Sequence, residues 1–399
     1  MTNEPNQPKQ HDAVLGGQSP PPVQGAILGG IEGVKQRLAS PLVKARIVAV
    51  NEALNYADAG LDLVIRALQD ESAQVQHCAY QLLRDRIEPQ VKQALREYKP
   101  WDLVERLLEK SKIYYRFTRF ANRKVKEFDP QTGITQTAGA AYVLKDKHFD
   151  ALLQDPKASK IEALLFAWGG AFHNDLIAAK DRLKSLKAVF SGPYGCDYQI
   201  SWLNHHNISP ILEAYPQLEI LQVRCGGGLD CNPLRHDNLK ALIVESGGLS
   251  SETITQICDL KLPALNHLEL WLGTPNYGGD SSVGDLMPIL YNGLFPRLAY
   301  LGLCNSEYSD EIAEAVADST EIEFLKVLDL SMGTLGDKGA EALLNCPAVN
   351  RLDILNLSEN FLSDEMIERL NQLDVQLIAN KQKSIEQDYR NYRYCSITE

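Results

Sequence analysis

Seven segments in the second half of the chain share one spacing of apolar residues, L-x-x-L-x-L or a close variant of it. Their first leucines follow one another at intervals of 32, 21, 26, 33, 27 and 27 residues. The segments begin at Leu186, Leu218, Leu239, Leu265, Leu298, Leu325 and Leu352. Recurrence at such intervals indicates a repeat architecture, in which each unit buries its apolar edge only by stacking on its neighbours. This part of the chain is therefore predicted to fold as a solenoid.

Helical segments lie between or after the last three of these strand-like runs. They read SDEIAEAVADS, GDKGAEALLNC and SDEMIERLNQL. A strand and a helix at an interval of about 27 residues is typical of long leucine-rich repeats, whose parallel strands line the concave side of a horseshoe. The predicted fold class is an α/β repeat protein, with this horseshoe over residues 154–380. Asn360, in the last full unit, is expected to satisfy backbone groups where the chain leaves the strand.

Three longer phrases read HLELWLGTPNYGGD, LGLCNSEYSDEIAEAV and LDLSMGTLGDKGAEALL. Through them the segment from Arg119 to Glu399 resembles ribonuclease-inhibitor-type leucine-rich repeats, and more closely an uncharacterised bacterial family of such proteins. The resemblance implies an interaction horseshoe and brings no catalytic residues with it. Within the first phrase, HLELWLG is interpreted as a strand and TPNYGGD as a loop that its glycines turn, because the fixed spacing of a phosphate-binding loop is absent.

Residues 31–110 show helical periodicity throughout, in short segments separated by Asp, Glu-Ser, Pro or Gly. Two of these segments superpose at an offset of 30 residues, with Arg46 on Gln76 and Ala49 on Ala79. The pattern predicts an α-solenoid of paired helices. The stretch DESAQVQHCAYQLL resembles the HEAT-like repeats of phycobilisome-lyase-type proteins, which implies a building unit and not an activity. Residues 1–30 are rich in Pro, Gln and Gly and are predicted to form a flexible arm.

In residues 111–153 the spacing of apolar residues is no longer helical. YYRFTRFANRKVKEF alternates basic with aromatic or apolar residues, and DPQTG is a turn sequence before AYVL, so a basic β-hairpin or linker is predicted. A candidate nucleic-acid patch combines these aromatics with seven basic residues and no acid. The seven are Lys110, Lys112, Arg116, Arg119, Arg123, Lys124 and Lys126. The competing interpretation is a basic strand that docks on the acidic repeat domain beside it.

The net charge of −12 is unevenly distributed along the chain. Residues 1–125 carry 18 Lys and Arg against 14 Asp and Glu, and the other 274 residues carry 22 against 38. An acidic surface of this size repels nucleic acid and anionic membranes, and it favours basic protein partners or serves solubility. No apolar run of about 18 residues occurs and the start of the chain lacks a signal-peptide pattern, so a cytoplasmic location is predicted.

Neither a metal nor a cofactor is expected. The closest pair among the eight cysteines, Cys225 and Cys231, lacks CxxC spacing, and the thiols are interpreted as reduced and mostly buried. His205 and His206 are adjacent in sequence and therefore point in different directions, while His236 lies thirty residues further on. None of these groups has the spacing of a structural metal site.

Neighbouring side chains of a strand face opposite sides of a sheet. In the register of the repeat, Leu265, Leu268 and Leu270 are predicted to point into the core and the residues between them to project from the concave face. Ten candidate partner-binding residues follow: Gln222, Arg224, Glu245, His267, Glu269, Trp271, Tyr300, Asp329, Asn356 and Ser358. Trp271 is the expected anchor of an interface. The competing interpretation is that Trp271 packs under the TPNYGGD loop.

The three carboxylates of this column, Glu245, Glu269 and Asp329, are also candidates for acid–base chemistry. An open sheet face does not exclude water, however, and no nucleophile accompanies them, so the chain is predicted not to be an enzyme. We expect a scaffold or adaptor that captures a protein partner on the concave face. Replacing Trp271 by Ala together with Glu269 by Lys is expected to abolish capture without unfolding the chain.

Two other functions remain open at this point. The first is a HEAT-type accessory factor that presents a protein substrate to an enzyme or a bilin-lyase system. The second is a nucleic-acid-associated adaptor that acts through the basic segment. Residues 381–399 are predicted to add a capping strand over the last repeat, or to form a peptide-like tail for a partner.

Overall fold

The chain forms two compact units, residues 1–99 and residues 100–399, each described by itself. The computed structural model describes residues 30–70, 72–83, 86, 88–91, 94, 118–166, 172–192, 194, 200, 206–226, 229–384 and 392–397. The predicted N-terminal arm, Lys110, Lys112 and Arg116 therefore lie outside the described residues. None of the described helices combines the length and the apolar character needed to cross a membrane.

The first unit is helical where helices are predicted. Its described elements are α1 (Gly30–Leu38), α2 (Val43–Ala53), η1 (Leu54–Tyr56), α3 (Ala57–Ala67) and α4 (Ala73–Leu83). Val50, Val64 and Leu83 are fully buried where these helices meet. The buried Arg46 guanidinium donates to Asp70 Oδ1 at 3.1 Å, and Gln76 donates to the backbone oxygen of the same aspartate. Arg46 and Gln76, which superpose in the 30-residue repeat, thus both donate to Asp70. The assignment of these helices to the HEAT-like type stays a prediction.

The second unit is built on a curved sheet of twelve strands, in which every pair from β2 onward is parallel. In spatial order the strands are β1 (Arg119–Phe120), β2 (Arg123–Glu127), β3 (Ala140–Leu144), β4 (Ala163–Phe166), β5 (Ala188–Ser191), β7 (Ile220–Cys225), β9 (Ala241–Ser246), β10 (His267–Gly273), β11 (Tyr300–Ser306), β12 (Val327–Asp329), β13 (Ile354–Asn356) and β14 (Gln376–Ile378). Two short strands, β6 (His206–Asn207) and β8 (Leu229–Asp230), pair separately.

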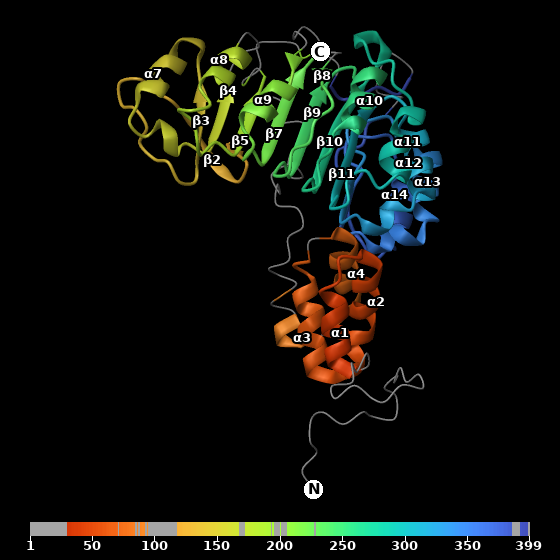
Figure 1. Cartoon of the computed structure of the whole chain (residues 1–399). Coiled ribbons are helices and arrows are strands. Elements are labelled where there is room, and N and C mark those ends of the chain that lie inside the picture. Colours follow the sequence, from red (N-terminus) through yellow and green to blue (C-terminus); the bar gives the residue numbers. More distant parts are fainter. Residues whose placement is uncertain are drawn as a thin grey trace, which may run out of the picture. The chain divides into compact units, whose positions relative to one another are not determined.

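Helices lie along one side of this sheet, so that the strands follow an arc with the helices outside it (Figure 1). They are α7 (Phe149–Gln154), α8 (Phe172–Ala178), α9 (Ser209–Ala214), α10 (Ser251–Asp259), α11 (Val283–Tyr291), α12 (Ser309–Asp318), α13 (Asp337–Leu344) and α14 (Asp364–Leu370). Single turns of 3-10 helix complete several repeats: η3 (Asp146–His148), η4 (Ala158–Lys160), η6 (Pro275–Tyr277), η7 (Glu321–Phe324) and η8 (Pro347–Arg351). A continuous apolar cluster, here called the main core, fills the space between sheet and helices.

The predicted register of the repeat is confirmed. Each of the seven strands begins two residues after the first leucine of its segment, as β12 begins at Val327 after Leu325. The inward leucines Leu265, Leu268 and Leu270 are fully buried in the main core. The helices read from SDEIAEAVADS, GDKGAEALLNC and SDEMIERLNQL are α12, α13 and α14.

The predicted hairpin of residues 111–153 is wrong in its pairing. The antiparallel turn joins β1 to β2 through Ala121 and Asn122, whose φ angles are 50° and 59°. β2 and β3 then run parallel, so DPQTG lies in a crossover and not in a hairpin turn. All five residues of β3 are buried, as expected for an interior strand of a parallel sheet that is covered on both faces. The horseshoe sheet therefore begins well before residue 154.

The backbone role predicted for Asn360 is confirmed. Its Oδ1 accepts from the Leu335 backbone N–H at 3.1 Å, and its Nδ2 donates to the backbone oxygens of Leu330 and Leu357 at 2.8 and 3.1 Å. The side chain is fully buried, so replacing it by Ala leaves these groups without partners. We expect Asn360→Ala to lower the free energy of unfolding of the second unit by about 2–3 kcal/mol, measured by urea denaturation. Asn345→Ala, at an exposed residue that directly follows α13, is the control and should change it by less than about 0.5 kcal/mol.

Candidate partner-binding face

The ten predicted face residues lie on the side of the sheet opposite the main core, which we call the concave face. Trp271, for example, packs with Cys304 and Met332 in a cluster separate from the main core. The exposure expected for these residues is wrong, because nine of the ten side chains are buried and Ser358 is half-buried. Large polar side chains on adjacent strands contact one another, and Ile397 packs against the Trp271 cluster. Their role in partner binding stays a prediction.

On β7 and β9 the buried polar residues form a charge-paired group. Arg224 and Glu245 are in register on the two strands, and the guanidinium donates to Glu245 Oε2 from Nε and from Nη2, each at 2.8 Å. Gln222 Nε2 donates to the other carboxylate oxygen at 2.8 Å. The Arg224 guanidinium also lies 5.3 Å from the centre of the Phe190 ring. The charge of Glu245 is thus fully engaged within the protein.

A second polar group spans β10, β11 and β12. Trp271 Nε1 donates to Glu269 Oε1 at 2.7 Å, and the His267 ring stacks on Tyr300 at 3.8 Å between ring centres. The Tyr300 hydroxyl donates to Asp329 Oδ2 at 2.6 Å. Burial, together with the charges of Asp329 and Glu269, raises the pKa of Tyr300 well above its usual value, so this hydroxyl stays protonated.

Gly302, in the middle of β11, makes room for this group. A Cβ atom at position 302 would stand 2.9 Å from Glu269 Cγ and 3.1 Å from the Tyr300 ring. Gly302 is in register with Glu269 on one side and with Asp329 on the other. The missing side chain therefore lets the larger side chains on either side close over the sheet.

The C-terminal segment of residues 392–397, here called the tail, crosses the concave face. Ser396 N donates to the backbone oxygen of Met332 at 2.8 Å, and the Cys395 thiol donates to that of Gly273 at 3.8 Å. Ile397 packs against the cluster that contains Trp271. Within the described residues 381–384 and 392–397, the predicted capping strand over the last repeat does not form. The last strand of the sheet is β14, and the tail lies across the ends of β10, β11 and β12 instead.

Asn305, at the end of β11, holds the backbone of the tail by two hydrogen bonds. Its Oδ1 accepts from Ile397 N at 2.9 Å and its Nδ2 donates to Ile397 O at 2.6 Å. Its side chain is fully buried and its φ angle is 53°, a conformation that asparagine tolerates better than most residues. The amide therefore binds the backbone N–H and C=O of Ile397, and this contact does not depend on a particular side chain of the tail.

Lys383 fastens the tail from the other side. Its ammonium group donates to Tyr394 O at 2.6 Å, to Gly333 O at 2.9 Å and to Ser396 Oγ at 3.3 Å. It also lies 4.9 Å from the centre of the Phe361 ring and 5.0 Å from that of Tyr394. Lys383 is half-buried, and this burial lowers the pKa of its ammonium group to about 8.

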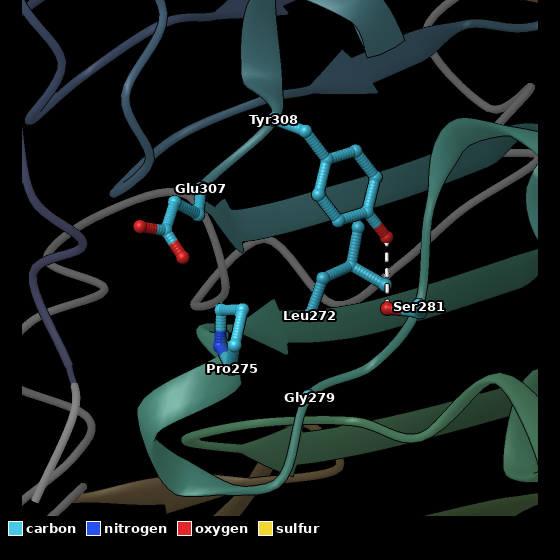
Figure 2. Close-up of a pocket in the computed structure, with 7 residues that line it drawn as sticks. Leu272, Pro275, Gly279, Ser281, Glu307 and Tyr308 are labelled. Atoms are coloured by element: carbon cyan, nitrogen blue, oxygen red, sulfur yellow. Dashed lines mark hydrogen bonds between the residues drawn. The ribbon is translucent and has the colours of Figure 1, made fainter.

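A small pocket of about 210 Å³ adjoins the tail at the ends of β10 and β11. Figure 2 shows Glu307 and Pro275 on one side of it and the Tyr308 ring on the other, where the hydroxyl of Tyr308 contacts that of Ser281 at 2.9 Å. Leu272, Gly273 and Gly279 complete the lining. Glu307 is exposed, and within the described residues it forms no ion pair. An apolar pocket with a carboxylate at its rim suits the stem and charge of a basic side chain.

The described part of the basic segment is engaged within the sheet. Arg123 pairs with Glu162 at 2.9 Å, and Lys126 donates to Gln136 Oε1 at 2.8 Å. Phe120 is buried and is therefore withdrawn from any base that might stack on it. Arg119 and Lys124 are exposed. The patch predicted from seven basic residues is thus reduced, within the described residues, to two exposed ones.

The described cysteines and His236 are engaged or buried within the fold. The seven described cysteines are free thiols, and burial raises the pKa of Cys225 and of Cys231 to about 12. Both ring nitrogens of His236 face backbone groups, Tyr215 O at 3.1 Å and Leu239 N at 3.0 Å. No group of three possible metal ligands occurs in the described part of the chain.

Among known proteins, the chain is similar to solved structures. No family model and no curated protein match the chain. A Bacteroides fragilis protein solved by the Northeast Structural Genomics Consortium is 26% identical, with a TM-score of 0.56, over 63% of this chain and 72% of that one. An internalin from Listeria monocytogenes is 14% identical, with a TM-score of 0.27, over 61% and 73%. The strand–helix repeat defines the second unit as a leucine-rich-repeat-like horseshoe.

Proposed function

We propose that the protein is a non-catalytic scaffold or adaptor that captures a partner protein on the concave face of its horseshoe. The observation that supports this proposal is that the face already holds a stretch of polypeptide. Asn305 and Met332 pair with peptide groups of the tail, and the Trp271 cluster receives a side chain from it. A surface that pairs backbone groups and takes selected side chains is of the kind that recognises peptides.

The charge of the face favours a basic partner. Asp310 already binds a guanidinium of the tail, since Arg393 Nη1 lies 2.9 Å from its Oδ2. Glu307 offers a second carboxylate at the rim of the pocket. The surplus of acidic residues beyond residue 125 adds a long-range attraction for cations. We infer that a Lys or Arg of the partner enters the pocket beside Glu307.

The buried carboxylates support a role without catalysis. Glu245 is paired with Arg224, Glu269 accepts from Trp271, and Asp329 accepts from Tyr300. Groups held in this way are withdrawn from substrate and from water. They stabilise the face and leave binding to the groups at its rim.

Reversing the charge at Glu307 tests the proposal. The full chain and its Glu307→Lys variant would be used to capture proteins from a native-source lysate, with the bound proteins quantified by mass spectrometry. We expect the variant to retain at least about tenfold less of the specific partner, because a cation at the rim repels a basic side chain. Glu368→Lys, which makes the same charge change on the exposed side of α14, is the matched control and should capture as the wild type does. Equal capture by all three proteins would contradict the proposal.

A further inference from the structure

We propose, building on the function proposed above, that the tail is a built-in ligand of the concave face. The partner segment that the horseshoe captures is then an extended peptide of the same chemistry, and it displaces the tail in order to bind. In this arrangement the C-terminal segment occupies the binding site on the concave face until a competing peptide displaces it.

The tail packs on the horseshoe without being part of its repeat structure. It adds no strand to the twelve-stranded sheet, and none of its six residues belongs to the main core. The apolar layer between sheet and helices is therefore complete without it. Its contacts are hydrogen bonds and a small cluster around Trp271, of the kind that an interface makes. Release of the tail leaves the stacked repeats in place.

Much of the recognition is directed at the backbone of the tail and does not depend on its sequence. The face supplies the Asn305 amide to both peptide groups of Ile397, the Met332 carbonyl to Ser396 N, and the Lys383 ammonium to Tyr394 O. Asn305 is fully buried, so its amide requires a partner wherever water cannot reach it. Any peptide that follows the same path satisfies the same groups.

Side chains of the tail define which peptide fits. Cys395 is buried, so its position admits a small side chain, while Ile397 two residues later places an aliphatic group on the Trp271 cluster. Tyr394 packs edge-on against Phe361 with ring centres 5.5 Å apart. Arg393 reaches Asp310. The expected motif is basic, aromatic, small, hydroxyl-bearing, aliphatic, since Ser396 Oγ accepts from Lys383 at 3.3 Å.

A tethered ligand lowers the apparent affinity for a free one. Only the fraction of molecules with the tail released binds a competing peptide, so the apparent dissociation constant rises as that fraction falls. The tether keeps the tail at a high effective concentration beside its site. Weakening the tail within the full chain should therefore strengthen the binding of a peptide in trans.

Ser396→Pro in the full chain tests this proposal, because proline removes the N–H that donates to Met332 and leaves every horseshoe residue unchanged. The ligand is a fluorescein-labelled synthetic peptide with the sequence of residues 392–397, amidated and kept reduced, and binding is followed by fluorescence anisotropy. We expect a dissociation constant at least about tenfold lower for Ser396→Pro than for the wild type. Tyr392→Ala, at an exposed position of the tail, is the matched control and should bind as the wild type does.

Alkylation of Cys395, located by peptide mass spectrometry, reports tail release independently. Burial raises the pKa of this thiol to about 12, so it reacts slowly while the tail is docked and faster once it is free. Faster alkylation in Ser396→Pro together with tighter peptide binding supports the proposal. A second variant, Ile397→Asp, removes the aliphatic contact and should act in the same direction. Unchanged alkylation in both variants would show that the tail is a fixed part of the fold and would overturn the proposal.

The two proposals fail in different ways. If the tail is released but the peptide binds the variant no better than the wild type, displacement is wrong. Should Glu307→Lys still abolish partner capture in that case, the horseshoe remains a partner-binding scaffold whose ligand differs from the tail. Unchanged partner capture by Glu307→Lys together with unchanged peptide binding by Ser396→Pro would contradict both.

Discussion

Glu245→Ala is expected to lower the free energy of unfolding of the second unit by about 3–5 kcal/mol, because it leaves the Arg224 guanidinium charged and buried without its carboxylate. Arg224 donates twice to Glu245, Gln222 donates once, and the side chains of the ion pair are 2% and 0% exposed. A buried guanidinium keeps its charge, and Glu245 is the carboxylate that balances this charge by two hydrogen bonds. Urea denaturation followed by far-UV circular dichroism measures the loss.

The same protein contains a matched control for this prediction. Arg369 and Glu341 form a two-point pair on α14 and α13, with contacts of 2.6 and 2.7 Å. Their side chains are 44% and 42% exposed, so water screens the charges. Glu341→Ala should therefore cost less than about 1 kcal/mol. Equal small losses for both variants would mean that water reaches Glu245, and would refute the buried pair.

Trp271→Ala is expected to cost the second unit about 3–5 kcal/mol. The indole is fully buried, packs with Cys304, Met332 and Ile397, and donates its N–H to Glu269. Its removal leaves a cavity on the concave face and takes one hydrogen-bond donor from a buried carboxylate. The change is read from the midpoint of urea denaturation and from the thermal melting temperature.

Met287→Ala is the comparison for this substitution. Met287 lies on α11 and is 42% exposed, so its truncation should change the unfolding free energy by less than about 0.5 kcal/mol. A similarly small effect at Trp271 would contradict the packed cluster. Trp271→Ala with Glu269→Lys is therefore expected to destabilise the fold, contrary to the prediction from sequence, because both side chains are fully buried. Loss of capture by that double variant would report unfolding, and Glu307 is the better position for a test of binding.

Much of the horseshoe can be predicted from local sequence. The spacing of the leucines determines where each strand begins, and the two-residue alternation of a strand separates Leu268 from Glu269 and Trp271. Asn360 was assigned its backbone contacts for the same reason, since a turn residue of one repeat acts on groups close to it in the stack. These features depend on the spacing of apolar residues and on contacts between neighbouring repeats, and both are visible in a single sequence.

Local sequence does not determine the pairing of the basic segment, because a hairpin and a parallel crossover share turn residues such as those of DPQTG. Only the pairing of Lys124 with Ala140 and of Glu127 with Val143 shows that β2 and β3 run in the same direction. The complete burial of β3 follows from its place inside the sheet. The hydrophobic pattern of AYVL is compatible with either arrangement.

The repeat, the register and the face on which each side chain lies follow from the period of the chain, and they can therefore be predicted from local sequence. Whether the concave face is exposed or covered by the tail depends on tertiary contacts. The contact of Asn305 with Ile397 joins residues 92 positions apart, and that of Cys395 with Gly273 joins residues 122 apart. No local pattern encodes such distances, so the tail on the concave face emerged only from the fold.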